Sequence, residues 1–314
     1  MPWVVGIDEA GYGPNLGPLV QAAVAIRLPD DDPAGWGTLA PVVRRAHETA
    51  DGRLLIDDSK KVYTGGGLAA LECGVHAALR LMEPTVGDLV RRVALAGVGD
   101  ALGAEAWFDP THAAPVVADP EIILAAVAAL PAGPTATGFG AAVASLVPAP
   151  RFNGLCDEAG SKGAVLARGL VELIPAAFEG MPSDDEPVRV VCDKHGGRNF
   201  YAAMIQAAFP DGWVVVEKES ALESRYRVEG LGRPVSVVFR PRADGDSVAV
   251  ALASMLCKYL REVCMIQFNR FWARHVPDLA PTAGYPNDAK RFYAEIRPAM
   301  AKLGLSEDQV WRKR

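Results

Sequence analysis

Short apolar runs and longer amphipathic stretches follow one another along the chain. Apolar runs bounded by glycine or polar residues predict strands buried in a sheet. Such runs lie at residues 3–7, 20–27, 188–192, 213–217 and 235–239. Apolar positions at helical spacing predict helices, which we expect at residues 68–82, 86–96, 120–130, 136–146, 162–178, 199–209, 247–268 and 287–303. Strands mixed with helices predict an α/β fold.

The middle of the chain, residues 83–150, differs in amino-acid composition from the rest. It is rich in alanine, glycine and proline, and turn signals separate its predicted helices. We interpret it as an inserted helical segment within a single domain that spans residues 1–314. Directly after it, Ser161 is expected to be the N-cap of the next helix.

Composition and charge narrow the class of protein. Of the 314 residues, 50% are hydrophobic and 22% are charged, which is ordinary for a globular chain with a sizeable core. No apolar run approaches the roughly 20 residues needed to cross a bilayer, and the N-terminus begins with a predicted strand rather than a secretion signal. The five cysteines form no CxxC pair and are expected to be reduced thiols, so we expect a cytoplasmic protein without a membrane partner. The net charge of −6 argues against a basic protein that coats nucleic acid, but it is compatible with a nuclease.

Acidic residues stand where predicted strands end. Asp8 and Glu9 end the first strand, Asp193 ends another, and Asp244 and Asp246 precede the longest predicted helix. Four carboxylates that meet at strand ends can hold two Mg²⁺ ions, because Mg²⁺ prefers oxygen ligands, and such a pair activates water for phosphodiester cleavage. Asp244 is favoured as the fourth ligand, whereas Asp246 is expected to cap the helix.

Several basic residues have two interpretations. Arg198 either clamps a phosphate or closes a salt bridge with a neighbouring acid. His195 is either structural or takes part in proton transfer, since it follows a predicted ligand by two residues. Lys60 either contacts a phosphate or lies in a solvated turn. Lys258 and Arg261, three residues apart on one predicted helix, favour surface ion pairing.

Four motifs occur in an order that resembles a known family. They are residues 6–14 with 17–20, residues 58–61, residues 242–244 with 253–262, and residues 284–286. The first pair reads GIDEAGYGP and GPLV, the second motif reads DSKK, the third pair reads RAD and ASMLCKYLRE, and the last reads GYP. Together they resemble the ribonuclease HII (type 2 ribonuclease H) family, with the middle segment as an addition.

The resemblance implies a ribonuclease H-like fold, with a mixed five-stranded sheet flanked by helices. It also implies an endonuclease that uses two Mg²⁺ or Mn²⁺ ions to hydrolyse the RNA strand of RNA–DNA hybrids, or ribonucleotides embedded in duplex DNA. Carried over by position, the catalytic metal ligands are Asp8, Glu9, Asp193 and Asp244. The implied nucleic-acid contacts are Gly11, Tyr12 and Gly13 at the ribose 2′-OH, Ser59 and Lys60 at backbone phosphate, and Tyr285 on the sugar.

The chain departs from the resembled family at its substrate-binding positions. Tyr12 stands where the family has arginine or lysine, and Lys290 is nearest to the place of a usual histidine. We therefore expect ribonucleotide dependence to be kept, while the preference for a single embedded ribonucleotide is relaxed. The alternatives are a related nuclease of the same fold acting on another nucleic-acid structure, and a catalytically inactive nucleic-acid-binding protein. An ATP-binding protein of the sugar-kinase and actin type fits the later acids poorly.

Overall fold

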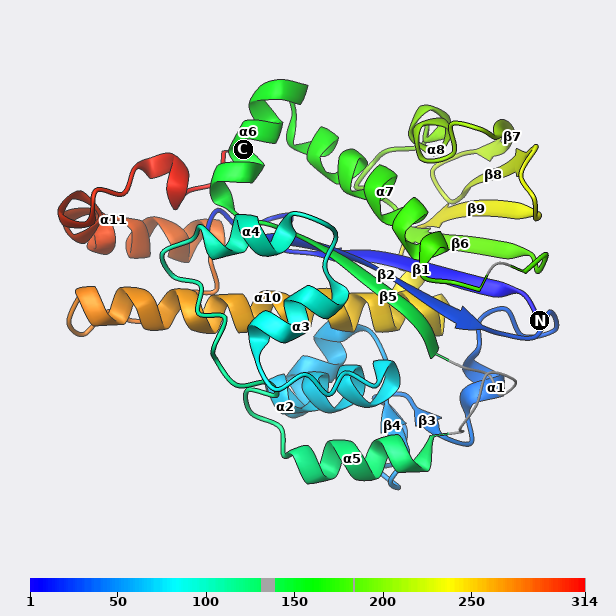
Figure 1. Cartoon of the computed structure of the whole chain (residues 1–314), viewed down its shortest axis with the longest axis horizontal. Helices are drawn as coiled ribbons and strands as arrows, with labels where there is room; N and C mark the ends of the chain where they lie inside the picture. Colours follow the sequence, from blue (N-terminus) through cyan, green and yellow to red (C-terminus); the bar gives the residue numbers. More distant parts are fainter. Residues whose placement is uncertain (131–138, 183, 314) are drawn as a thin grey trace.

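A computed structural model of the chain describes residues 1–130, 139–182 and 184–313. Its centre is a mixed sheet with the strand order β5-β2-β1-β6-β9-β8-β7 (Figure 1). The strands are β1 (Trp3–Ala10), β2 (Leu19–Arg27), β5 (Phe139–Val147), β6 (Val188–Asp193), β7 (Trp213–Glu219), β8 (Ser224–Glu229) and β9 (Val235–Arg240). β6 runs parallel to both β1 and β9, and the other neighbouring pairs are antiparallel. The expected five-stranded sheet is therefore wrong: the sheet in the described residues has seven strands, because the β7–β8 hairpin extends it beyond β9.

Helices cover both faces of this sheet. α10 lies along one face over β1 and β2 with α2 packed on it, and α7 and α8 lie on the opposite side (Figure 1). The helices are α1 (Trp36–Leu39), α2 (Ser59–Leu79), α3 (Val86–Val93), α4 (Val98–Gly103), α5 (Pro120–Ala129), α6 (Ala149–Ala159), α7 (Lys162–Glu179), α8 (Ala202–Ala208), α9 (Ala243–Asp246), α10 (Val248–His275), α11 (Pro286–Leu303) and the 3₁₀ turn η1 (Glu307–Gln309). β3 (Val43–Arg44) and β4 (Leu54–Leu55) form a separate two-stranded sheet.

β1 and β2 are buried on both faces, as predicted, whereas β7 at the edge of the sheet has no buried residue, and its expected burial is wrong. Val4 packs in the core on the α10 side of β1, and its neighbour Val5 packs on the α7 side. Gly6 allows α10 to sit directly on β1, since a Cβ there would lie 2.2 Å from the backbone nitrogen of Val250. This close approach fixes the start of α10 beside the end of β1, where the acidic residues lie.

One predicted helix is wrong. Residues 139–147 form strand β5, which pairs antiparallel with β2 at the edge of the sheet, and residues 136–138 lie outside the described part of the chain. Alanine is common in this stretch and suits a helix, but cross-strand pairing and burial decide the outcome. The segment 83–150 is therefore not purely helical, because it contributes a strand to the central sheet. That it is an insertion stays a prediction.

One unpredicted strand and one shifted helix start are further differences from expectation. β8 was not predicted, although its residues alternate between buried and exposed along the whole strand, a signal of a half-buried strand. α2 begins at Ser59 rather than 68, and Gly67 interrupts it with φ 63° and ψ −155°. Ser161 is the N-cap of α7 as predicted, and its side chain accepts a hydrogen bond from the backbone N–H of Ala164.

All five cysteines are free thiols, as expected from their spacing. Among the helices of the described residues, none combines the length and apolarity that crossing a membrane requires.

Candidate functional site

Strand topology brings separate acidic segments to one place. β1 and β6 are parallel neighbours and pair up to the residues just before Asp8 and Asp193, so these two acids come next at the same level. β6 also pairs with β9, where Asp193 lies opposite Arg240. The short helix α9 follows β9, and the backbone N–H of Ala243 donates to Asp193 Oδ1 (3.4 Å). This contact places Asp244 next to the carboxyl ends of β1 and β6.

The first two acids lie at the end of β1, where Asp8 is buried and Glu9 is half-buried. Burial, with 9% of Asp8 exposed, raises the pKa of Asp8 well above its usual value, and the charge of Glu9 raises it further. Burial raises the pKa of Glu9 to about 7, and the charges of Asp193 and Asp244 act in the same direction. A raised carboxyl pKa means that the negative charge is poorly compensated. A cation from outside would therefore be stabilised at these strand ends.

The other two acids are in the same electrostatic environment. Burial raises the pKa of Asp193, although backbone N–H groups oppose this rise. Burial, followed by the charges of Asp58 and Asp193, raises the pKa of Asp244. The charge of Lys60 lowers the pKa of Glu9, Asp193 and Asp244. Lys60 therefore stands within electrostatic range of the carboxylates rather than in a remote solvated turn.

Two buried serines support Asp8. A hydrogen bond with Ser254, on α10, stabilises the charged form of Asp8. The Oγ atoms of Ser254 and Ser59 are 3.0 Å apart, and Ser59 is 7% exposed. Ser59 thus joins the carboxylate site through Ser254, and its expected contact with a phosphate stays a prediction.

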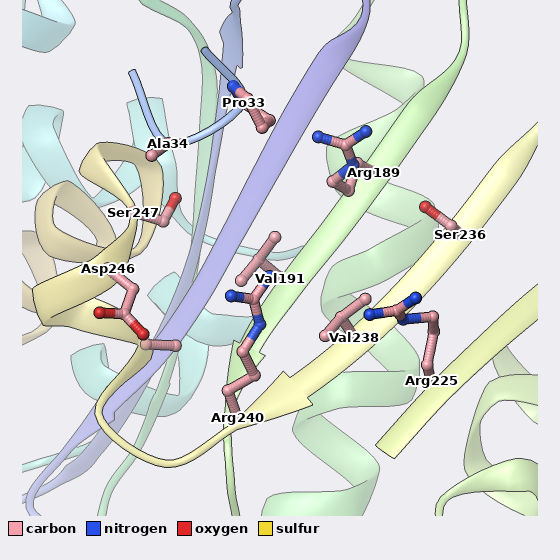
Figure 2. A pocket seen from close by; sticks show the side chains of 11 residues that line it. Pro33, Ala34, Arg189, Val191, Arg225, Ser236, Val238, Arg240, Asp246 and Ser247 are labelled. Atoms are coloured by element: carbon pink, nitrogen blue, oxygen red, sulfur yellow. The ribbon is translucent and has the colours of Figure 1, made fainter. Parts of the chain in front are cut away.

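The helix α9 separates the two acids that the sequence offered as the fourth ligand. Side chains two residues apart on a helix are rotated by about 200° around its axis, so they point to nearly opposite sides. Asp244 is on the side of Asp58 and Asp193, whose charges raise its pKa. Asp246 instead lines a different cavity with Ser247 (Figure 2). The expectation that Asp246 caps α10 is wrong, since Ser247 is the N-cap residue.

The donor set suits a hard divalent cation. All four acids offer carboxylate oxygens, which Mg²⁺ and Mn²⁺ prefer. Within the described ranges, however, no three or more His, Cys, Asp and Glu side chains stand close enough together to hold one metal ion. The charges of neighbouring acids nevertheless raise the pKa values of Asp8, Glu9 and Asp244. Their role as metal ligands stays a prediction.

Glycines shape the loop that follows β1. Gly11 has φ 87°, and a Cβ there would lie 2.5 Å from Arg261 Nε, so a larger residue does not fit. At Gly13 a Cβ would be 3.9 Å from the ring of Tyr285. The Tyr285 side chain is 53% exposed. The structure therefore brings the predicted loop and the predicted sugar contact together at the surface.

Two buried arginines hold this loop from behind. Arg261 Nη2 donates to the carbonyl oxygens of Leu16 (3.2 Å) and Ala283 (3.0 Å). Arg312 Nη2 donates to the carbonyl oxygens of Gly11 (2.6 Å) and Pro14. The surface ion pairing expected for Arg261 is wrong, because its side chain is 3% exposed.

The pKa of the second arginine, Arg312, is unusually low. Burial, followed by the charge of Arg261, lowers the pKa of Arg312 to about 9. Arg312 was not predicted from the sequence, because nothing local marks a residue whose partner Gly11 lies 301 positions away.

Tyr12 lies between the carboxylates and two cations. Lys162 Nζ, at the start of α7, is 4.3 Å from the centre of the Tyr12 ring. Burial raises the pKa of Tyr12, the charge of Glu9 raises it further, and the charge of Arg198 lowers it. Arg198 Nη1 also contacts Met204 Sδ (3.3 Å). Lys162 was missed by sequence reasoning, since it reaches this position only through the packing of α7.

The turn after Asp193 is a packed structure. The His195 ring lies edge-on to the rings of Tyr201 and Phe239. Burial, followed by the charge of Arg198, lowers the pKa of His195 to about 4, so its imidazole is neutral at pH 7. A cavity of about 300 Å³ lies beside Asp193. These contacts favour the structural interpretation of His195.

Comparisons with known proteins find likeness in structure. No protein-family model matches the chain, and no curated protein matches it in sequence. Ribonuclease H2 from Pyrococcus horikoshii is 14% identical with a TM-score of 0.46, and the match covers 98% of this chain and 92% of that one. RNase HII from Archaeoglobus fulgidus, solved as a complex with PCNA, is 15% identical with a TM-score of 0.43, covering 99% and 94%. RNase H3 from Aquifex aeolicus is 14% identical with a TM-score of 0.46, covering 99% and 71%.

Proposed function

We propose that this chain is a metal-dependent endonuclease of the ribonuclease HII type. Its substrate would be the RNA strand of RNA–DNA hybrids, or ribonucleotides embedded in duplex DNA, and its fold would be a divergent ribonuclease H-like fold with an added hairpin. The observation that supports the proposal is that Asp8, Glu9 and Asp193 lie at the ends of two parallel strands, with Asp244 nearby on α9 and each pKa raised. Strongly perturbed carboxyl groups gathered in this way are typical of a functional site.

The four acids would act together in the proposed reaction, as metal ligands. They would hold two Mg²⁺ or Mn²⁺ ions, which when bound supply an activated water and stabilise the leaving oxygen of the phosphodiester. The hydrogen bond from Ser254 orients Asp8 for this role. The backbone N–H groups that reach Asp193 orient that carboxylate.

The surrounding residues would position the nucleic acid. The main chain of the loop can approach a ribose 2′-OH closely, because Gly11 and Gly13 lack side chains. Tyr285 would stack on the neighbouring sugar, and its exposed ring beside Gly13 is suitably placed. Lys60 and Arg198 would contact backbone phosphates, and Lys162 would do the same, which its contact with Tyr12 supports.

One observation favours a second candidate function. Tyr12 offers a phenol where the resembled family offers a cation, which suits a nuclease of the same fold that acts on another nucleic-acid structure. Lys162 and Arg198 restore positive charge at that place, so the ribonucleotide-directed activity is preferred. The expected cytoplasmic location belongs to the same proposal, and the free cysteines agree with it.

Cleavage of three duplexes of one sequence tests the proposal. An RNA–DNA hybrid, a DNA duplex with one ribonucleotide and plain DNA are incubated with Mg²⁺ or Mn²⁺. We expect cleavage of both ribose-containing duplexes, abolished in Asp8→Asn and kept in the exposed-acid control Asp211→Asn. Cutting plain DNA equally well would favour the broader nuclease. Binding without cleavage in either metal would favour the inactive binding protein.

A further inference from the structure

A cavity lined by arginines lies on the part of the sheet that α10 leaves uncovered. Its volume is about 410 Å³. Arg189 on β6, Arg225 on β8 and Arg240 on β9 approach it across the strands, and Ser247 borders it from the start of α10 (Figure 2). Nothing in the proposed cleavage reaction uses these residues.

Strand alternation puts the cavity on the same face of the sheet as Asp8 and Asp193. Successive side chains of a strand point to opposite faces, so Arg189, Val191 and Asp193 share one face of β6. On β9 the same rule applies to Ser236 and Arg240. Four residues of strand separate Arg189 from Asp193, which corresponds to roughly 13 Å between their Cα atoms. The cavity is therefore a neighbour of the candidate active site on one continuous surface.

The guanidinium groups are only partly neutralised. Among the residues that the structure describes, Arg189 has no hydrogen-bond or ion-pair partner. Arg225 Nη2 donates to Glu223 Oε1 (3.0 Å), and Arg240 Nε is 3.7 Å from Glu223 Oε2. Asp246 contributes one carboxylate to the lining. Three cations thus face the carboxylates of Asp246 and Glu223, and the excess charge is positive.

A buried hydroxyl in the same cavity lacks a partner. Ser247 is 4% exposed, and within the described chain its Oγ makes no hydrogen bond. It is the N-cap residue of α10, yet its side chain does not cap the helix. The backbone N–H of Val248 is already taken by the carbonyl oxygen of Ala34 (3.0 Å). Buried polar groups are rarely left unpaired, and an oxygen of a bound ligand would satisfy this hydroxyl.

We propose that this cavity binds a phosphate group of the nucleic-acid backbone at a distance from the bond that is cut. A guanidinium group can donate to two phosphate oxygens at once. Among the described residues, nothing else engages the guanidinium group of Arg189. Arg240 and Ser247 complete the contact from either side. A separation of roughly 13 Å corresponds to about four steps along a duplex axis, so one duplex reaches both places. The nucleic-acid occupant rests on the proposed function, whereas the phosphate chemistry does not.

Two measurements test the site and distinguish a backbone phosphate from a free one. The first follows the arginine side-chain resonances of ¹⁵N-labelled protein during titration with inorganic phosphate. The second measures the affinity of a labelled RNA–DNA hybrid in an Asp8→Asn background, as a function of salt. The test variants are Arg189→Ala and, as a second way to weaken the cavity, the more exposed Arg225→Ala. The matched control is Arg92→Ala, which removes one exposed arginine of α3.

The expected result is a loss that Arg189→Ala shows and Arg92→Ala does not. Phosphate should shift Arg189 in the wild type, and the hybrid Kd should rise about fivefold with the salt slope reduced by about one. Unchanged hybrid affinity in folded Arg189→Ala and Arg225→Ala would overturn the proposal, even if the wild type cuts hybrids. If the wild type neither binds nor cuts any duplex, the proposed function fails. Phosphate binding through Arg189 would then overturn only the nucleic-acid occupant and keep the anion site.

Discussion

Two regions of this chain bury charges of like sign, and they differ in what surrounds those charges. In the carboxylate site, Asp8 is 9% exposed and lies against Glu9. Behind the glycine loop, Arg261 and Arg312 are 3% and 1% exposed. The two arginines donate to four backbone carbonyl oxygens, whereas the carboxylates mainly oppose one another.

The difference separates a structural role from a functional one. Four backbone carbonyl oxygens accept hydrogen bonds from the arginine pair and tie the loop to the C-terminal residues, although burial still lowers the pKa of Arg312 to about 9. The carboxylates have Lys60 and a few backbone N–H groups, which leave their pKa values raised. Charges that the fold leaves uncompensated mark a place where an external cation binds.

The largest expected effect comes from breaking the carboxylate site. Asp8→Asn removes one charge and a proposed metal ligand, so we expect the rate of hybrid cleavage to fall at least about 1000-fold, or about 4 kcal/mol. Hybrid affinity should stay within a few-fold of the wild type, since little phosphate contact is lost. Single-turnover kinetics and fluorescence anisotropy measure the two quantities. Metal-dependent activity that persists in a purified variant, at the wild-type rate, would remove the two-metal mechanism.

The choice between Asp244 and Asp246 sharpens the same comparison. Asp244→Asn should lower the cleavage rate roughly 100-fold, because this acid belongs to the carboxylate site. Asp246→Asn removes the same charge two residues away, on the other side of α9, and should change the rate less than about threefold. The ratio of the two rates is the measurement. The assignment of the fourth acid is reversed if Asp246→Asn is the slower enzyme.

The buried arginine pair should respond in stability rather than in chemistry. Arg312→Met leaves the carbonyl oxygens of Gly11 and Pro14 without a donor, so we expect the free energy of unfolding to fall by about 2 kcal/mol. Lys313→Met removes a neighbouring exposed cation and should lower the free energy of unfolding much less than Arg312→Met does. Urea denaturation followed by circular dichroism measures both. Equal losses would mean that the loop does not depend on its buried anchor.

An element is predictable from the sequence when local residues determine it, and less so when distant residues do. The apolar runs of β1, β6 and β9 are predictable because most of their residues are buried, and Asp8 and Asp193 are predictable because they directly follow two of those runs. β5 was mistaken for a helix, since its alanines carry little strand signal and its place is set by pairing with β2. β8 was missed although its alternation was visible, because charged residues fill its exposed positions.

The parts of the site that the sequence could not predict are contacts made by packing alone. Arg312 lies 301 positions from Gly11, and no motif surrounds it. Lys162 follows the N-cap Ser161, and that local signal predicts a helix start but not the neighbour of Tyr12. The spacing of the acids in the sequence predicted where they lie. The arrangement of α7 and the C-terminal residues around the loop could be seen only in the structure.

The smallest expected effect concerns the contact between Lys162 and Tyr12. It tests whether the positive charge can be moved from α7 to the glycine loop. Lys162→Ala should raise the Kd of hybrid and single-ribonucleotide duplex alike by about threefold, because one half-buried charge expected to lie near a phosphate is lost. Tyr12→Arg alone would place a third cation beside Lys162 and Arg198, where like charges repel. The double variant Tyr12→Arg with Lys162→Ala avoids this repulsion and keeps the net charge of the wild type.

We expect the double variant to prefer the single-ribonucleotide duplex more strongly than the wild type does. The basic side chain would then extend from the glycine loop itself, next to the backbone that is expected to contact the ribose, instead of reaching it from α7 across the phenol. Competition between the two labelled duplexes in one reaction measures the preference as a ratio of cleavage rates. An unchanged ratio, together with wild-type affinity in Lys162→Ala, would show that the contact between Tyr12 and Lys162 only joins α7 to the loop, as the buried arginines join the loop to the C-terminal residues.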